Sequence, residues 1–310
     1  MWPEIHHILK EDQIQNYNNV FLNELSLFIE QEKLDESFKE SFKSVYLPLA
    51  KWIENKHTTT PVVIGLNGGQ GSGKSTLSKL LVLILETLFS KTVLHLSIDD
   101  LYISRYRRLL LADEVHPLLS VRGVPGTHDV NLGIEILKTL KTNINNKLKI
   151  PRFDKALDDL LPDEEWTVIR KMPDIIIFEG WCVGAKPQSD SELLKPLNKL
   201  EESKDTQGNW RHYVNRQLTE QYNDLFSYID HLIMLKVPDM ESVFEWRCLQ
   251  ESKLNHRENT TSHIKSEIEV KEFVMYFERI TMQCLKEMPQ RADVVLNLNK
   301  QHQISKVIVK

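Results

Sequence analysis

Cysteine is scarce in this sequence and is not arranged for a structural role. The 310 residues include only three cysteines, Cys182, Cys248 and Cys284, and no two of them are spaced as a CxxC pair. An odd number of widely separated thiols argues against a disulfide framework and against a zinc site. We therefore expect reduced thiols and a cytoplasmic protein.

Long hydrophobic runs are also missing. The longest uninterrupted aliphatic run, from Leu80 to Leu85, is far shorter than the roughly 18 residues that cross a bilayer. The first residues, MWPEIHHILKEDQ, lack a basic start followed by an apolar stretch. The sequence therefore predicts no membrane association and no secretory signal.

Positive charge is not in excess. The chain has 39 Lys and Arg against 44 Asp and Glu, which gives a formal net charge of −5. Proteins that bind nucleic acid in general carry a basic surface, so we expect no nucleic-acid partner. A small anionic substrate is compatible with this balance, because local basic residues decide its binding.

Glycine is rare, and its distribution is the strongest signal in the sequence. Five of the 11 glycines fall within nine residues: Gly65, Gly68, Gly69, Gly71 and Gly73. The stretch at 68–75 fits the phosphate-binding pattern G-x-x-x-x-G-K-[ST]. An apolar, β-branched run at 61–66 precedes it and a helical pattern at 74–89 follows it, which is the context that a P-loop requires.

The P-loop predicts a binding site for the phosphates of ATP. Glycines let backbone N–H groups point at a phosphate, and the N-terminus of the following helix adds its positive end. In this pattern the Lys74 ammonium reaches the β- and γ-phosphates, and the Ser75 hydroxyl binds Mg²⁺. The expected nucleotide-binding residues are Gly68, Gly69, Gln70, Gly71, Ser72, Gly73, Lys74, Ser75 and Thr76.

Strand and helix patterns alternate along the rest of the chain. Short apolar runs predict strands at 61–66, 92–98, 174–178, 231–237 and 292–298. Helical patterns are found at 74–89, 131–140, 212–227, 242–249 and 267–286. This order predicts an α/β fold, a three-layer P-loop NTPase sandwich with a mostly parallel sheet.

The first 57 residues have a different pattern. They contain no glycine, and their apolar residues recur at close to helical spacing. We expect residues 1–57 to form a helical N-terminal extension, packed on a P-loop domain of residues 58–310.

Acidic residues stand at the ends of two predicted strands. Asp99 and Asp100 follow the strand at 92–98, and Glu179 follows the strand at 174–178. Ligands bind at this edge in open α/β sheets, and phosphoryl transfer needs a group that orients the acceptor hydroxyl. Neighbours on an extended chain point in opposite directions, so we expect only one of the two aspartates to face the phosphate. Glu179 is a candidate for the magnesium site.

Two other classes of P-loop protein fit less well. A GTPase would carry Asn-Lys-x-Asp after an apolar strand, whereas NKLE at 198–201 ends in Glu and lies in a polar stretch. A mechanochemical ATPase would usually carry two acidic residues where Glu179 is followed by Gly180. These differences favour a kinase that acts on a small molecule.

Two polar segments between the strands have the character of loops over an active site. They read HPLLSVRGVPGTHD at 116–129 and IPRFDK at 150–155. Their basic residues Arg122, Arg152 and Lys155 are suited to binding the anionic end of an acceptor.

Six motifs together resemble the glycerate 3-kinases of the plant and fungal type. They are the P-loop at 68–75, SIDDLY at 97–102, HPLLSVRGVPGTHD at 116–129, PRFDK at 151–155, FEGWCVG at 178–184 and EWRCLQ at 245–250. Those enzymes are part of a wider group with phosphoribulokinase, uridine kinase and pantothenate kinase. The similarity covers roughly residues 40–290, in order.

The resemblance implies roles for individual residues. DDLY at 99–102 is similar to the Asp-x-Phe-Tyr string that supplies the catalytic base in uridine-kinase-like enzymes, so Asp99 is the expected base. Arg247, with Arg257, is expected to close over the transferred phosphate from a lid near 240–265. The expected catalytic residues are Asp99, Lys74, Glu179 and Arg247, the metal ligands Ser75 and Glu179, and the acceptor-binding residues Arg122, His128, Asp129, Arg152, Asp154 and Lys155.

Two regions depart from the family pattern. The chain is acidic after PRFDK, at 158–159 and 163–165, and residues 186–212 also differ from what the resemblance predicts. The resemblance implies a kinase that uses ATP and Mg²⁺ to phosphorylate a small hydroxy acid, with D-glycerate as the first candidate. A uridine or pantothenate-like kinase with another alcohol acceptor, and a nucleotide-binding protein without turnover, are the alternatives.

Overall fold

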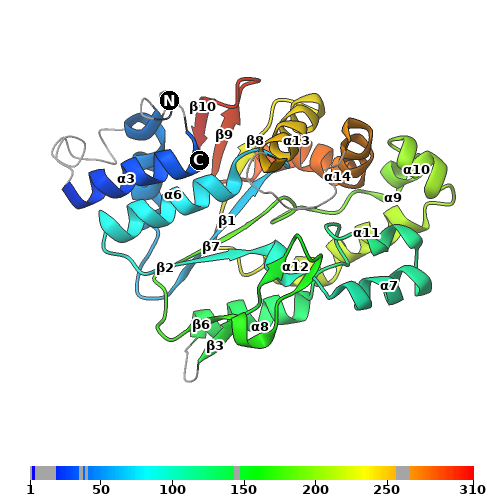
Figure 1. The fold of residues 1–310 in the computed structure, drawn as a ribbon, viewed down its shortest axis with the longest axis horizontal. Coiled ribbons are helices and arrows are strands. Elements are labelled where there is room, and N and C mark those ends of the chain that lie inside the picture. The colour runs from blue at the N-terminus through cyan, green and yellow to red at the C-terminus, as the bar shows by residue number, and fades with distance from the viewer. Residues whose placement is uncertain (1, 4–18, 35–37, 39–40, 143–146, 256–265) are drawn as a thin grey trace.

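A central sheet of six strands organises the molecule (Figure 1). The computed structural model describes residues 2–3, 19–34, 38, 41–142, 147–255 and 266–310. The strand order is β10-β9-β8-β1-β7-β2, and only β10 runs antiparallel to its neighbour. The strands are β1 (Val62–Gly68), β2 (Val93–Ser97), β7 (Ile175–Gly180), β8 (His231–Lys236), β9 (Val294–Leu298) and β10 (Ile304–Val309).

The two central strands β1 and β7 are buried along their whole length. Their sequences, VVIGLNG and IIIFEG, are continuous apolar and β-branched runs, as expected for parallel strands with both faces covered. In the register of the sheet, Glu179 of β7 lies beside Leu66 of β1 and beside Ser97 of β2. The carboxyl ends of these three strands are therefore level, and the segments that follow them meet at one edge.

Helices cover both faces of the sheet and complete three layers (Figure 1). One hydrophobic core lies under α3 (Asn19–Glu32), the π-helix η1 (Phe42–Tyr46), α5 (Leu47–Glu54), α6 (Lys74–Thr87) and α13 (Met240–Asn255). The other lies under α8 (Val130–Thr142), α11 (Asn209–Thr219), α12 (Gln221–Phe226) and most of α14 (Glu267–Glu287). Successive residues of β1 divide between them, because Val63 belongs to the second core and Ile64 to the first.

Shorter elements connect the strands and helices of the sandwich. Four are 3₁₀ turns: η2 (Ile98–Leu101), η3 (Pro117–Ser120), η4 (Asp163–Glu165) and η5 (Met288–Gln290). Three are helices: α7 (Arg105–Glu114), α9 (Asp190–Leu193) and α10 (Lys199–Lys204). Two are small antiparallel pairs: β3 (Leu148–Ile150) with β6 (Thr167–Ile169), and β4 (Phe153–Asp154) with β5 (Asp159–Leu160).

The predicted α/β sandwich with a mostly parallel sheet is confirmed, and the deviations have local causes. The helix predicted at 212–227 is two helices, because the backbone leaves helical geometry at Glu220 (φ −97°, ψ −102°). Helix α7 was not predicted because it lacks an apolar stripe: its one buried residue is Arg108. The boundary proposed near residue 57 stays a prediction, and α3 and α5 share a core with α6.

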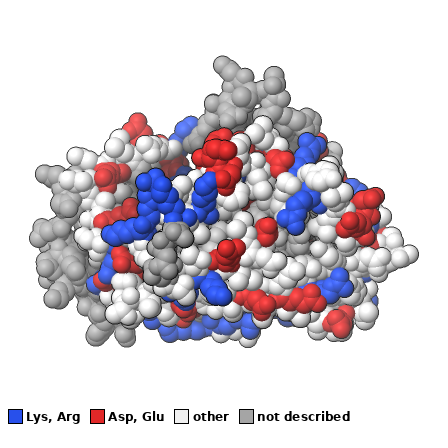
Figure 2. All heavy atoms as spheres, turned by 90° about the horizontal axis from the view of Figure 1, so that it is seen from below, with Lys and Arg blue, Asp and Glu red and all other residues white. Residues whose placement is uncertain are grey.

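Three observations concern the predicted location and partners of the protein. Within the described residues, no helix has both the length and the apolar character to cross a membrane. Cys182, Cys248 and Cys284 are free thiols. On the face shown in Figure 2, acidic and basic side chains lie among one another. The absence of a nucleic-acid partner stays a prediction.

Candidate active site

The P-loop links β1 to α6 through glycines that no other residue would replace easily. Gly71 and Gly73 have φ values of 72° and 87°, in the left-handed region that favours glycine. A Cβ on Gly71 would also lie 2.9 Å from Cβ of Trp246. Before the loop, the Asn67 side chain donates hydrogen bonds to the carbonyl oxygens of Trp181 (3.0 Å) and Val183 (2.9 Å). The loop is therefore held in a fixed curve at the start of α6.

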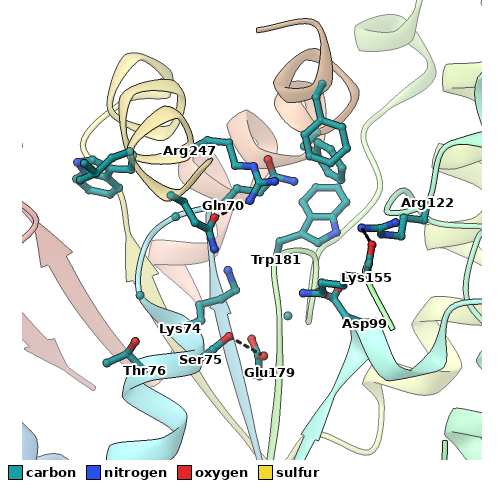
Figure 3. Close-up of a pocket in the computed structure, with 18 of the residues that line it drawn as sticks. Gln70, Lys74, Ser75, Thr76, Asp99, Arg122, Lys155, Glu179, Trp181 and Arg247 are labelled. Atoms are coloured by element: carbon teal, nitrogen blue, oxygen red, sulfur yellow. Dashed lines mark hydrogen bonds and ion pairs between the residues drawn. The ribbon is translucent and has the colours of Figure 1, made fainter. Parts of the chain in front are cut away.

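A cavity of about 340 Å³ opens above this loop (Figure 3). It is lined by P-loop residues, by the segments that follow β2 and β7, and by α13 and α14: Gln70, Gly71, Gly73, Lys74, Ser75, Thr76, Asp99, Tyr102, Arg122, Lys155, Glu179, Gly180, Trp181, Trp246, Arg247, Leu249, Gln250, Phe273, Phe277 and His302. The structure thus brings the four predicted catalytic residues together with six of the nine predicted nucleotide-binding residues. The other three, Gly68, Gly69 and Ser72, lie outside the lining.

Lys74 points into this cavity from the first turn of α6 (Figure 3). Its Nζ donates a hydrogen bond to the carbonyl oxygen of Gly69 at 3.0 Å. Burial lowers the pKa of Lys74, and the nearby carboxylates Glu179 and Asp99 oppose that shift. A partly desolvated ammonium that is held by the loop itself is well placed for a phosphate.

Ser75 and Glu179 meet on the floor of the cavity. The Ser75 hydroxyl donates a hydrogen bond to Oε1 of Glu179 at 3.2 Å. Burial pushes the pKa of Glu179 up, but His95, whose Nε2 lies 3.7 Å from Oε1, and the charge of Lys74 bring it below its usual value. Glu179 is therefore a carboxylate, and the hydroxyl and carboxylate oxygens are hard ligands of the kind that Mg²⁺ prefers.

Asp99 and Asp100 do not lie on an extended chain, which corrects the prediction that strand alternation separates them. They belong to the 3₁₀ turn η2, where successive side chains are rotated by about 120°. The two carboxylates still diverge: Asp99 lines the cavity, and Asp100 binds Nη1 of Arg152 at 2.7 Å and the backbone N–H of Phe153 at 3.3 Å. The predicted divergence is present, but its cause is the turn.

Both oxygens of Asp99 have partners. Oδ1 accepts a hydrogen bond from the Tyr102 hydroxyl at 2.8 Å, and Oδ2 is 2.6 Å from Nζ of Lys155. Burial raises the pKa of Asp99, but the charge and hydrogen bond of Lys155 and the hydrogen bond of Tyr102 outweigh it. The pKa of Asp99 therefore lies below its usual value, and its side chain is ionised.

Arg122 enters the cavity beside Asp99 and is held from behind (Figure 3). Its Nη1 is paired with Asp158, and its Nη2 donates a hydrogen bond to the carbonyl oxygen of Lys155 at 3.2 Å. Asp158 also binds Arg108, a fully buried residue, through Nη2 at 2.9 Å. One carboxylate is thus shared by two guanidinium groups, and the wall keeps a surplus of positive charge.

Four of the predicted acceptor-binding residues lie outside the lining of the cavity. Arg152 is paired with Asp100, Asp129 accepts a hydrogen bond from the backbone N–H of Leu132 (3.1 Å) at the start of α8, and Asp154 accepts from Ala156 and Leu157 in its own turn. His128 is buried behind Tyr102, with the two rings stacked at 4.5 Å. Of the six predicted acceptor-binding residues, Arg122 and Lys155 are the two that line the cavity.

Arg247 reaches the opposite rim from α13. Its guanidinium binds Oε1 of Gln250 at 2.7 Å, is paired with Glu251, and lies over the ring of Phe273 at 5.5 Å. In this state the predicted lid residue is tied to its own helix. Arg257, the second predicted lid residue, lies outside the described residues.

The aromatic side of the cavity was not predicted. Trp181 meets Phe277 of α14 edge to face at 4.9 Å, and its Nε1 donates a hydrogen bond to the carbonyl oxygen of Gly123 at 3.0 Å. Trp181 is part of the FEGWCVG motif, but Phe273 and Phe277 belong to an amphipathic helix whose pattern carries no sign of a site. Their contribution depends on long-range packing.

The segment at 186–212, which departs from the family pattern, fixes α14 from behind. Arg279 of α14 binds Glu201 through Nε at 2.7 Å and through Nη2 at 2.5 Å, and both residues are buried. Arg279 also donates hydrogen bonds to the carbonyl oxygens of Glu192 and Lys195. The segment therefore supports the helix that supplies Phe273 and Phe277, without entering the cavity.

Comparison with known proteins agrees with this geometry. Residues 42–225 match the family model described as KAP family P-loop domain. An uncharacterized kinase of Schizosaccharomyces pombe, mug58, is 33% identical over 224 residues, which are 70% of this chain and 78% of that protein.

Two D-glycerate 3-kinases are also similar to this chain. The chloroplastic enzyme of Arabidopsis thaliana is 29% identical over 272 residues, 82% of this chain and 55% of the plant protein, so this chain spans about half the length of that relative. The solved structure of the enzyme from Cryptococcus neoformans var. grubii shares the fold, with a TM-score of 0.70 at 23% identity over 86% of this chain and 96% of that one. The chain therefore belongs to the KAP family of P-loop domains and, with these relatives, to the P-loop kinases that include D-glycerate 3-kinase.

Proposed function

We propose that this protein transfers the γ-phosphoryl group of ATP to a hydroxyl group of a small acid, with D-glycerate as the first candidate. One observation carries the proposal: the Lys74 ammonium and the Asp99 carboxylate line one cavity from opposite sides, and Lys155 and Arg122 stand next to Asp99 (Figure 3). Such a cavity offers a phosphate-binding cation, a proton acceptor and an anion-binding group within one space.

In this proposal the residues act through position and charge. The P-loop backbone at 68–76 and Lys74 hold the phosphates and neutralise charge that develops on them. Asp99 orients the acceptor hydroxyl and takes its proton as the acceptor oxygen bonds to phosphorus. Arg247 closes on the transferred phosphate when it leaves Glu251.

Ser75 and Glu179 would hold Mg²⁺, since their oxygens lie together on the cavity floor. Mg²⁺ bound there would neutralise charge on the phosphates. No group of three or more His, Cys, Asp or Glu side chains suited to a metal ion occurs in the described part of the chain, so the nucleotide phosphates would complete the coordination.

The charge of the acceptor wall supports an acid as substrate. Asp158 is the carboxylate that Arg108 and Arg122 share, and Lys155, whose side chain is largely exposed, is paired with Asp99 on the same wall. A carboxylate on the acceptor would bind here while its hydroxyl faces Asp99. We also propose a cytoplasmic location, in keeping with three free cysteines.

A coupled assay of ADP release tests the proposal directly. The purified protein is incubated with MgATP and, one at a time, D-glycerate, related hydroxy acids, uridine and pantothenate. We expect saturable ADP release with D-glycerate at a KM of roughly 0.1–1 mM, a usual range for enzymes. Turnover with uridine or pantothenate but not with glycerate would remove the substrate assignment and keep the kinase. ATP binding without turnover on any acceptor would remove the kinase activity itself.

A further inference from the structure

The ion pair between Asp99 and Lys155 joins the proposed base to the proposed anion-binding residue. Oδ2 of Asp99 and Nζ of Lys155 are 2.6 Å apart, and the Lys155 side chain is 63% exposed whereas that of Asp99 is 27% exposed. The lysine therefore lies on the solvent side of the pair, at the end of a flexible stem, and can move without disturbing the wall.

The neighbouring cations are held in place and cannot move in this way. Arg122 is paired with Asp158 and bonded to a backbone carbonyl, and Arg152 is bonded to Asp100 and to the Thr167 hydroxyl at 2.8 Å. Lys74 is held by the P-loop carbonyl of Gly69. An anion that enters this side of the cavity finds Lys155 as the cation that is free to turn toward it.

The ion pair with Lys155 also occupies an oxygen of the proposed base, Asp99. Oδ1 of Asp99 accepts from the buried Tyr102 hydroxyl and Oδ2 is covered by Lys155, so both oxygens are engaged before any acceptor arrives. A hydroxyl that is to give its proton to Asp99 needs one of these positions. Tyr102 is fixed between His128 and Phe153, at ring distances of 4.5 and 5.0 Å, so Oδ2 is the position that can be vacated.

We propose that Lys155 restrains Asp99 until an anionic acceptor draws the lysine away. This inference rests on the proposed function in taking Asp99 as the base. A carboxylate on the acceptor takes over the Lys155 ammonium, Oδ2 becomes available, and the acceptor hydroxyl moves onto it. Without such an acceptor the lysine stays on Asp99, and water in the cavity is not activated against ATP. Lys155 is thus a specificity-determining residue that acts on turnover as well as on binding.

The other charged and titratable groups around Asp99 do not provide this control. Lys74 and Glu179 face it across the floor, and His128 and Cys182 lie on its inner side. Burial lowers the pKa of His128 to about 4, and burial raises that of Cys182 well above its usual value, so both are neutral near pH 7. Lys155 is the strongest influence that lowers the pKa of Asp99, which supports its role as the group that limits the basicity of the carboxylate.

The test is ATP hydrolysis in the absence of any acceptor. In that reaction a water oxygen bonds to the γ-phosphorus, the bond to the ADP oxygen breaks, and the water proton passes to Asp99. We expect Lys155→Met to hydrolyse MgATP about tenfold faster than the wild type, a fraction of the roughly 10²–10⁴-fold that general-base assistance can contribute. Lys155→Arg, which keeps the positive charge, should show less of this increase than Lys155→Met, and the double variant Asp99→Asn, Lys155→Met should lose the increase. The matched control is Lys149→Met. It removes a lysine of β3 that is paired with Asp163, and it should leave the rate of hydrolysis unchanged.

Two further measurements separate this inference from simple anion binding. With D-glycerate, Lys155→Met should raise KM, and the kcat for glycerol relative to that for glycerate should increase, because the neutral alcohol no longer has to compete with the lysine. As the pH is lowered, acceptor-free hydrolysis should begin to decline at a higher pH in Lys155→Met than in the wild type. The reason is that the substitution removes a positive charge that lowers the pKa of Asp99.

Unchanged or slower hydrolysis in a folded Lys155→Met protein, with only KM raised, would overturn the proposal and leave Lys155 as a plain binding residue. The hydrolysis assay uses no acceptor, so its result stands whether or not D-glycerate proves to be the substrate. Failure of the substrate assignment and failure of the restraint are therefore observed separately.

Discussion

The two walls of the candidate active-site cavity are built in different ways. The phosphate wall comes from one continuous segment of the chain, the P-loop and the first turn of α6 at 70–76, and its geometry comes from backbone and glycine. The acceptor wall takes its side chains from η2, from the loop at 116–129, from the β4 region, from β7 and from α14. Its charged residues are set by partners far away in sequence, such as Asp158 for Arg122.

This difference divides the work of the site. In the proposed function, the phosphate wall binds a group that is common to all nucleotides, and a short rigid loop is sufficient for it. In the proposed function, the acceptor wall has to distinguish one small molecule from another, and it would do so with side chains that can be exchanged one at a time. Substitutions should therefore abolish the reaction when they fall in the first wall and change its rate or selectivity when they fall in the second.

The largest expected effect is that of Lys74→Ala in the phosphate wall. Turnover should be abolished, a far larger loss than the tenfold fall that corresponds to about 1.4 kcal/mol of transition-state stabilisation. The fold should persist, because the Lys74 ammonium bonds to the loop and not to the core. The control is Lys79→Ala, further along α6, where the side chain is exposed and paired with Glu32. Retention of more than a tenth of the activity, measured by ADP release, would show that the loop binds phosphates without this lysine.

A smaller effect separates the two aspartates of the acceptor wall. Asp99→Asn keeps the size of the side chain but cannot take a proton, so kcat should fall by at least about 10² while MgATP binding is unchanged. Asp100→Asn weakens the contact with Arg152 outside the cavity and should lower kcat much less. Steady-state kinetics and calorimetric titration with MgATP measure both quantities. Equal damage from the two substitutions would mean that Asp99 is not the base.

The smallest effect concerns stability behind the acceptor wall. Burial lowers the pKa of His128 from 6.5 to about 4, and its Nδ1 lies 2.5 Å from the Tyr222 hydroxyl. Because the pKa of His128 is lower in the folded state than in the unfolded state, the contribution of neutral His128 to the free energy of unfolding is complete above pH 6.5. This contribution is lost as the pH falls toward 4. His128→Asn keeps a group near the Nδ1 position but does not titrate. Between pH 7 and pH 5 the wild type should lose roughly 2 kcal/mol more unfolding free energy than the variant, as measured by urea denaturation. Parallel losses in the two proteins would contradict a neutral buried His128.

The same contrast between walls explains how far the sequence could be interpreted. The P-loop, the strand before it and the helix after it form one local pattern, and the acidic residues at the ends of β2 and β7 follow from the rule for parallel sheets. The sequence pattern alone was therefore sufficient to place Asp99 and Glu179 at the site. The direction of the Asp99 side chain depends on the turn η2, and two acidic residues after a strand do not predict such a turn.

The acceptor wall could not be assembled from sequence because its composition is decided by pairing. Arg152, Asp129 and Asp154 occur in the motifs that point to the acceptor, but the first is bound to Asp100 and the other two cap local turns. A basic residue in a motif does not reveal which carboxylate will neutralise it. Phe277 was not predicted for a different reason: an aromatic residue on an amphipathic helix is usually a core residue, so the pattern does not indicate a site.

Through the buried pair of Arg279 and Glu201, the segment at 186–212 can affect the cavity from a distance. That segment touches α14 on one side, and the same helix carries Phe273 and Phe277 into the cavity on the other. Because the helix is rigid, a change in the length or packing of the segment would shift both aromatic rings together. Related kinases could thus diverge in the acceptors they accept by exchanging a stretch of chain that never meets a substrate, while every residue of the chemistry stays the same.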